Sequence, residues 1–63
     1  MIELTRLNDT KFTLNADLIE MVEEVPDTVI TLTTGKKVFV KENRYEIRNL
    51  VVRYKQEVFN KIL

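Results

Sequence analysis

Apolar and polar residues alternate along the first two thirds of the chain, in short runs separated by turn-forming residues. In the first run, for example, Ile2 and Leu4 alternate with Glu3 and Thr5. A period of two is typical of β-strands, because successive side chains point to opposite faces of a sheet. The pattern therefore predicts an antiparallel β-meander of four to five strands, within residues 2–5, 11–14, 18–25, 28–33 and 38–40.

Residues with turn chemistry lie between several of these runs. Asn8 and Asp9 form a pair that tolerates a positive φ, and Gly35, the only glycine, adopts one without a steric penalty. Pro26 fixes its own φ and is followed by Asp27, a second residue that turns favour. These positions predict tight connections between neighbouring strands.

The third run, residues 18–25, alternates less regularly than the others. Residues that suit one face of a strand are mixed with residues that suit the other: Ile19, Met21 and Val25 form the first set, Leu18 and Val22 the second. A β-bulge, or burial of both faces, would explain this mixture. The short connection before it, residues 15–17, contains two Asx side chains that can accept hydrogen bonds from nearby backbone amides.

From Asn43 onward the apolar period changes from two to about 3.6 residues, which is typical of a helix. Asn43 is a suitable N-cap, and Glu46 three residues later gives a near match to a capping box. No glycine or proline interrupts the chain from there to its last residue. The helical stripe predicted to pack on the sheet comprises Ile47, Leu50, Val51, Tyr54, Val58 and Ile62.

These elements predict an α+β fold. Residues 1–63 form a single domain, with a small antiparallel meander in residues 1–42 and one C-terminal α-helix in residues 43–63. A domain of this size buries only about 60% of the surface that its unfolded chain exposes, so its stability is marginal. Self-association is the support that its composition leaves available, because the chain has no cysteine for a disulfide and no histidine.

A second group of apolar residues lies well round the helix from the first stripe, at about 100° per residue. One sheet covers only one of these faces, so the second group indicates contact with another chain, with a wider intramolecular core as the alternative. Arg48 and Lys55 lie between the two groups. The predicted protein-interaction residues are Tyr45, Arg48, Val52, Lys55, Phe59 and Leu63.

The composition argues against catalysis. The chain contains no His, Cys, Ser or Trp, so the usual nucleophiles, proton shuttles and soft metal ligands are missing. The densest carboxylate group flanks a turn and indicates a solvated hairpin end in preference to a cation site; its members are Glu20, Glu23, Glu24 and Asp27. We predict no catalytic residue, cofactor, metal or small-molecule substrate.

The chain also lacks the signals that would direct it to a membrane. No apolar run approaches the roughly 20 residues that a membrane span needs. The N-terminus lacks the basic start and apolar stretch of a signal peptide. We therefore expect a cytoplasmic protein without a membrane span.

Charge is unevenly distributed, although the formal net charge is zero. Residues 1–35 carry two cationic and seven acidic side chains, 2 − 7 = −5, and residues 36–63 carry eight and three, 8 − 3 = +5. The halves either neutralise one another, within or between protomers, or present a basic surface to an acidic partner. The second possibility includes a nucleic-acid-binding regulator, the alternative function, which would use Arg44, Arg48 and Lys55 with Lys36 and Lys37.

Several motifs together resemble the FlbD/SwrD family of small flagellar proteins. An LTRLN start at residues 4–8 is followed by PDT-x-ITL-x-x-GKK at residues 26–37, and the resemblance covers residues 1–42, with the helix of residues 43–63 represented loosely. It implies a non-catalytic accessory role in bacterial flagellar or swarming motility, in support of motor power. It also implies a motor or assembly protein as a partner, and a location at the cytoplasmic periphery of the motor.

Overall fold

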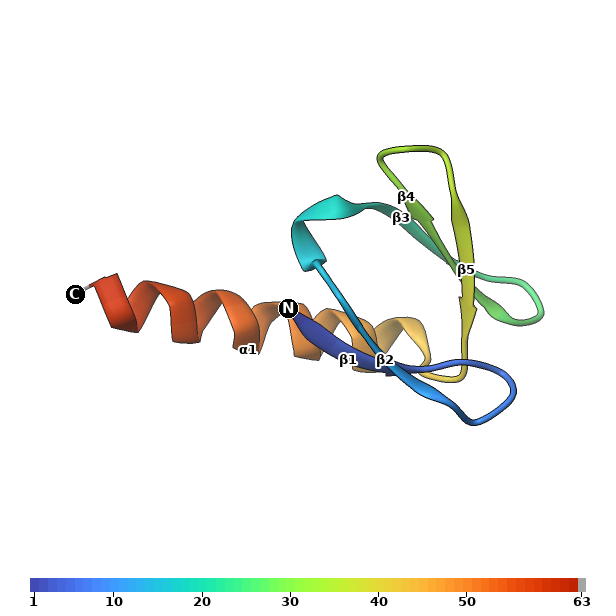
Figure 1. The fold of residues 1–63 in the computed structure, drawn as a ribbon, viewed down its shortest axis with the longest axis horizontal. Coiled ribbons are helices and arrows are strands. Elements are labelled where there is room, and N and C mark those ends of the chain that lie inside the picture. The colour runs from blue at the N-terminus through green and yellow to red at the C-terminus, as the bar shows by residue number, and fades with distance from the viewer. Residues whose placement is uncertain (63) are drawn as a thin grey trace.

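A computed structural model describes residues 1–62, with side-chain burial described for residues 1–60. Two antiparallel sheets and one long C-terminal helix make an α+β fold, as the sequence predicts (Figure 1). The elements are β1 (Ile2–Thr5), β2 (Lys11–Leu14), the 3₁₀-helix η1 (Ala16–Leu18), β3 (Ile19–Glu24), β4 (Thr28–Leu32), β5 (Lys37–Val40) and α1 (Arg44–Ile62).

The strands form two sheets and not the single meander that we predicted. The first sheet pairs β1 with β2, and the second has the order β3-β4-β5. The 3₁₀-helix η1 separates β2 from β3, and the side chain of Asn15 caps it by accepting a hydrogen bond from the backbone N–H of Asp17 at 3.0 Å. An isolated bridge between Arg6 and Val40 joins the sheets, supported by the Lys41 N–H, which donates to the Thr5 carbonyl at 2.8 Å.

The irregular third run contains the predicted bulge. The pairing of β3 with β4 shifts register between Ile19 and Met21, so that Ile19 lies opposite Leu32 and Met21 opposite Thr31. The extra residue changes the face on which the following side chains lie. Val22 is therefore packed against the core, whereas Met21 is exposed.

The turns have the backbone geometry that their residues favour. Asp9 has a φ of 70° and Gly35 a φ of 90°, both in the left-handed region. The connection between β3 and β4 contains a cis Val25–Pro26 peptide, and the Val25 N–H donates to the Asp27 carbonyl at 3.2 Å.

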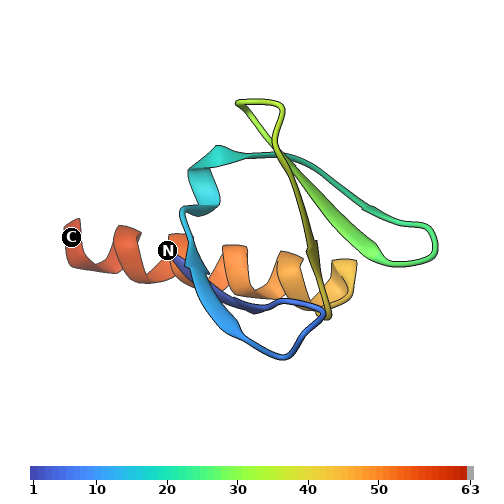
Figure 2. The ribbon, with the colours of Figure 1, turned by 45° about the vertical axis from the view of Figure 1, so that its right-hand side comes forward.

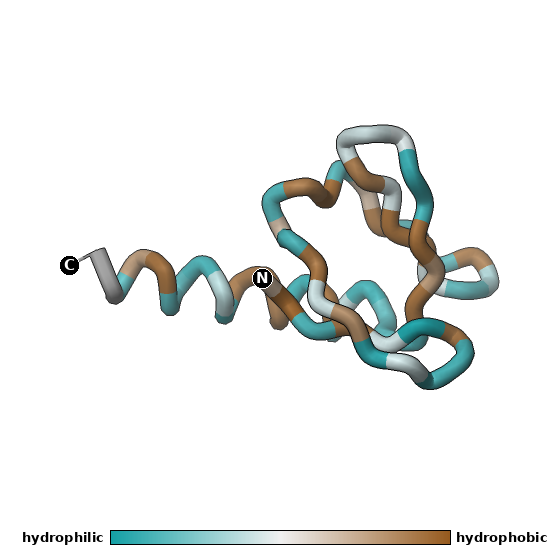
Figure 3. The backbone as a smooth tube through the Cα atoms, in the orientation of Figure 1, coloured by the Kyte–Doolittle hydropathy of each residue, from teal (hydrophilic) through white to brown (hydrophobic). Residues whose placement is uncertain are grey.

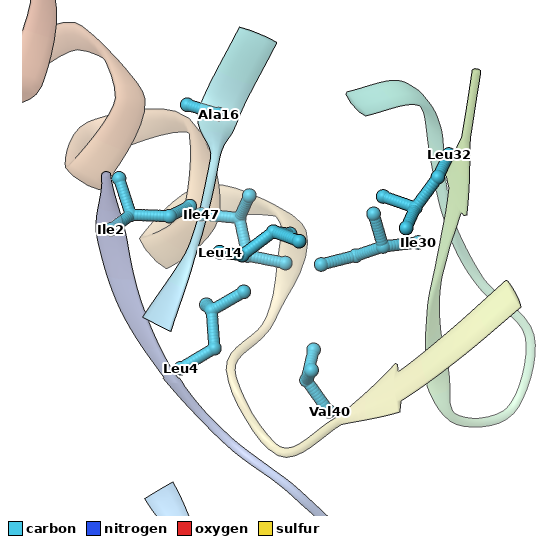
Figure 4. Packing of buried hydrophobic residues seen from close by; sticks show 8 residues of the cluster. All are labelled: Ile2, Leu4, Leu14, Ala16, Ile30, Leu32, Val40 and Ile47. Carbon is cyan, nitrogen blue, oxygen red and sulfur yellow. The ribbon is translucent and has the colours of Figure 1, made fainter. Parts of the chain in front are cut away.

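The core lies between the two sheets and the first half of α1. In Figure 4 the buried side chains of both sheets point toward one another, with Ile47 approaching from the helix. Leu4, Ile30 and Val40 are almost completely inaccessible to solvent. The buried apolar residues are Ile2, Leu4, Leu14, Ala16, Ile30, Leu32, Val40 and Ile47.

The helix begins with the predicted capping box. The Asn43 side chain accepts a hydrogen bond from the backbone N–H of Glu46 at 2.8 Å, and Glu46 Oε1 accepts from the backbone N–H of Asn43 at 3.3 Å. Glu24, at the end of β3, accepts a further bond from the backbone N–H of Arg44 at 2.9 Å. Two carboxylates thus satisfy amides at the positive end of the helix dipole.

The predicted packing stripe covers the sheets only along the first part of α1. Leu50, Val51 and Tyr54 are partly buried against the core, as predicted. Val58, which we predicted to pack there, is 40% exposed, because α1 extends beyond the strands (Figures 1 and 2). The side chain of Ile62 lies outside the described residues.

Candidate protein-interaction surface

The second half of α1 projects away from the rest of the domain. Figures 1 and 2 show its last turns extending past both sheets. The helix contains 19 residues and is therefore about 28 Å long, and the longest dimension of the molecule is 39 Å. Figure 3 shows hydrophobic and hydrophilic positions following one another along these turns, where Val58 and Phe59 are 40% and 61% exposed.

A groove lies between α1, η1 and β3, and we call it the helix groove. Its volume is about 470 Å³, within the size range of ligand sites. Apolar side chains from all three elements line it, including Val22 from β3 and Val51 from α1. Three cationic residues of α1 also line it, whereas Asp17 is its single acidic residue; the three are Arg44, Arg48 and Lys55.

A smaller hollow adjoins the helix groove at the start of α1. Its volume is about 400 Å³, and Tyr45, Asn43 and Glu24 line it. Arg44 and Arg48 line both the hollow and the groove, so the two form one continuous surface. Tyr45 is 73% exposed and offers an aromatic ring at this end.

The structure brings most of the predicted interaction residues onto this surface. Arg48, Val52 and Lys55 line the helix groove, Tyr45 lies in the adjoining hollow, and Phe59 follows one helical turn after Lys55. Leu63 lies outside the described residues. The prediction missed the wall formed by η1 and β3. The mixed pattern of residues 18–25 could have indicated this wall, because Val22, which breaks the alternation, is partly buried and lines the helix groove.

The amino-acid sequence of the chain matches a known family of proteins. The family model for FlbD, described as flagellar and swarming motility proteins, matches residues 1–59. The chain belongs to the FlbD family. The predicted resemblance is therefore confirmed, and the match extends through the helix as far as Phe59. Comparison with curated proteins and with solved structures finds no match.

The FlbD match covers all five strands, the helix groove and the exposed apolar residues of α1 up to Phe59. No helix in the described part of this family member is long and apolar enough to cross a membrane. Among residues 1–62, no cluster of three or more potential ligands is placed to hold a metal ion. The helix groove of the FlbD chain combines apolar residues of α1, η1 and β3 with the cations Arg44, Arg48 and Lys55.

One carboxyl group of the FlbD chain has a perturbed pKa. Burial raises the pKa of Glu42, but hydrogen bonds from the backbone and side chain of Thr5 lower it by more, with help from the Lys11 charge. The net pKa lies below that of a free glutamate. Glu42 does not line the helix groove, and its partner Thr5 belongs to β1, so the pair fixes the chain leading to α1.

Ion pairs neutralise little of the charge separation between the two halves of the FlbD chain. Lys41 pairs with Asp9 across the halves, whereas Lys11 and Glu3, 3.4 Å apart, belong to the same half. The described residues form no further ion pair within 4.0 Å. The cations bordering the helix groove consequently keep their positive field over an apolar surface.

Proposed function

We infer that this FlbD-family chain is a non-catalytic accessory protein of bacterial flagellar or swarming motility, acting by contact with other proteins. The observation that carries this inference is the exposed apolar face of α1, bordered by cations, within the family-matched residues. The missing histidine, cysteine and serine support a role without catalysis. The partners are a second copy of the chain and a motor or assembly protein, and the role is to support motor power from the cytoplasm.

The exposed side chains of the helix favour a protein partner. Val52 and Phe59 are seven residues apart and lie on one face of α1, where both are exposed, so they form an apolar line that faces solvent. The stems of Arg48 and Lys55 border this line and can cover its edges while their charges remain in water. Aromatic anchors with arginine nearby are the composition that protein interfaces favour.

The test is genetic and uses the helix face directly. We expect deletion of the gene to lower swimming speed and stall torque while leaving the number of flagella unchanged. Complementation with wild type should restore both, and complementation with Val52→Asp/Phe59→Asp should not. Asn60→Asp, which places a carboxylate on the polar side of α1, is the matched control and should restore motility. Normal speed and torque in the deletion strain would contradict the proposal.

The alternative function is a nucleic-acid-binding regulator, supported by the three cations, Arg44, Arg48 and Lys55, that line one groove. The zero net charge of the chain works against it, because nucleic-acid affinity rises with the number of counterions released. Titration of duplex and single-stranded oligonucleotides separates the two. We expect no affinity tighter than about micromolar at physiological salt, the limit of ordinary non-specific binding. Tighter, salt-sensitive binding, or loss of flagellar transcripts in the deletion strain, would favour the regulator.

A further inference from the structure

A second groove lies on the strands, away from α1, and we call it the strand groove. Its volume is about 530 Å³, and it runs between β5 and the β1–β2 hairpin. Four consecutive residues, 36–39, line it, which places the edge of β5 along one wall. Phe12 from β2 and Val38 from β5 contribute apolar surface, and both are only partly buried against the core.

All the charged residues that line the strand groove are cationic. Arg6, Lys36 and Lys37 line it, and none of its lining residues is acidic. The Arg6 guanidinium carbon lies 4.3 Å from the centroid of the Phe12 ring, in a cation–π arrangement. Within the described residues these three cations form no ion pair with a carboxylate. The groove therefore suits a segment that offers an apolar side chain flanked by carboxylates.

The same chain carries such a segment in its β3–β4 turn. Val25 is 86% exposed, the largest exposure of any bulky apolar residue in the described chain, and Pro26 beside it is exposed as well. Glu23 and Asp27 flank the pair and are exposed, and neither forms an ion pair with a side chain of residues 1–60. Figures 1 and 2 show this turn projecting from the molecule.

We propose that the β3–β4 turn of one copy docks into the strand groove of a second copy. Val25 and Pro26 would cover the apolar wall at Phe12 and Val38, and Glu23 and Asp27 would approach the cations of the groove. The turn and the groove are different surfaces, so the contact is head-to-tail and generates either a closed ring or an open chain of copies. It is separate from the helix face and extends the proposed function to ordered assembly.

The size of the contact sets its strength. A turn inserted in a groove buries much less than the roughly 1,200–2,000 Å² of a stable interface, so the affinity is weak and depends on the charges. We therefore expect sedimentation velocity to show association that rises between about 10 μM and about 1 mM protein. The association should weaken when salt rises from about 50 mM to about 500 mM, because ions screen the exposed charges.

Variants that reverse one charge in the turn or in the groove test this contact specifically. Lys36→Glu in the groove and Glu23→Lys in the turn should each weaken association at least about fivefold, since each replaces an attraction by a repulsion. An equimolar mixture of the two variants should associate more strongly than either alone, because the reversed turn then meets the reversed groove. Arg53→Glu and Glu57→Lys make the same charge changes on the exposed surface of α1 and serve as controls that leave association unchanged.

Two further variants separate this contact from unfolding and from association through the helix. Val25→Asp should abolish the association without lowering the melting temperature, because the side chain is almost fully exposed. Phe59→Asp should leave the charge-reversal effects intact, because it changes only the helix face. Failure of the mixture to recover association would overturn the proposal. So would loss of binding to oligonucleotides or anionic vesicles in Lys36→Glu with unchanged self-association, since the groove would then serve an anionic ligand.

Discussion

Glu42 binds Thr5 with both carboxylate oxygens, across 37 positions of sequence. Oε1 accepts a hydrogen bond from the Thr5 backbone N–H at 2.9 Å, and Oε2 accepts from the Thr5 hydroxyl at 2.8 Å. Glu42 lies between β5 and α1, and Thr5 ends β1. The pair therefore fastens the first sheet to the segment that leads into the helix.

The first prediction concerns the pH dependence of stability. The folded-state pKa of Glu42 is depressed, so the unfolded chain binds more protons as the pH falls. The contribution of Glu42 is complete above the unfolded pKa of about 4.3 and is lost as the pH falls through the folded pKa. Urea unfolding between about pH 7 and pH 3 should show this loss at its acidic end.

Replacing the carboxylate tests whether Glu42 causes that loss. Glu42→Gln keeps the size of the side chain but removes the charge that strengthens the two hydrogen bonds. We expect the free energy of unfolding to be lower by about 1–2 kcal/mol at neutral pH. We also expect it to fall less steeply than in wild type as the pH is lowered. Glu57→Gln, on an exposed part of α1, is the control. If the free energy of unfolding of Glu42→Gln falls at acidic pH as steeply as that of wild type, other carboxyl groups cause the pH dependence.

The second prediction concerns the start of α1. Asn43→Ala removes the acceptor for the Glu46 N–H and should lower the free energy of unfolding by about 1 kcal/mol. Asn43→Ser keeps an N-capping oxygen, so its free energy of unfolding should fall by less. Both are measured by urea denaturation with circular dichroism. Equal losses in the two variants would show that the side chain acts in some way other than capping.

The third prediction concerns the β4–β5 turn. Gly35→Ala should lower stability by about 1–2 kcal/mol, because a side chain disfavours a left-handed φ of 90°. Apart from Gly35 and its two chain neighbours, no heavy atom lies within 4 Å of the added Cβ position, so the cost belongs to the backbone and not to a clash. Gly35→Asn should cost less, since asparagine visits this region more readily. A larger loss of stability in Gly35→Asn than in Gly35→Ala would contradict a backbone origin of the cost.

Local chemistry in the sequence predicted much of the fold. Gly35 and Asp9 adopt the positive φ that their residue types tolerate, and Asn43 and Glu46 form the predicted cap. The division into two sheets was not predictable from the same signals. It depends on the turn of 3₁₀-helix after Asn15 and on the bridge from Arg6 to Val40, and period-two patterning does not encode which strands pair.

The candidate surface was partly predictable for a similar reason. Helical spacing placed Arg48, Val52 and Lys55 on one side of α1, and the structure places all three on the helix groove. The same spacing gave Val58 to the core, where it does not lie. Periodicity assigns a residue to a face of the helix, but only the length of the sheets decides where that face stops being covered.

The last prediction addresses association through the projecting helix. Phe59→Asp puts a carboxylate on the exposed apolar line while leaving Ile47, the buried anchor of α1, untouched. Light scattering should show an oligomer for wild type and a smaller species for the variant, because a charge would have to be buried in the interface.

Stability measurements distinguish an interface from a core. Phe59 is 61% exposed, so Phe59→Asp should leave the stability of the monomer nearly unchanged, whereas Ile47→Ala should lower it by about 2–5 kcal/mol through a cavity. Asn60→Asp is the matched control, because it adds the same charge one residue away on the polar side and should leave the mass unchanged. If the wild-type protein stays monomeric at high concentration, the helix face does not mediate self-association and must bind a different partner. Burial against a second copy adds core that a chain of 63 residues otherwise lacks, so the melting temperature should rise with protein concentration. Phe59→Asp should reduce that dependence to the part that the separate contact between the β3–β4 turn and the strand groove contributes.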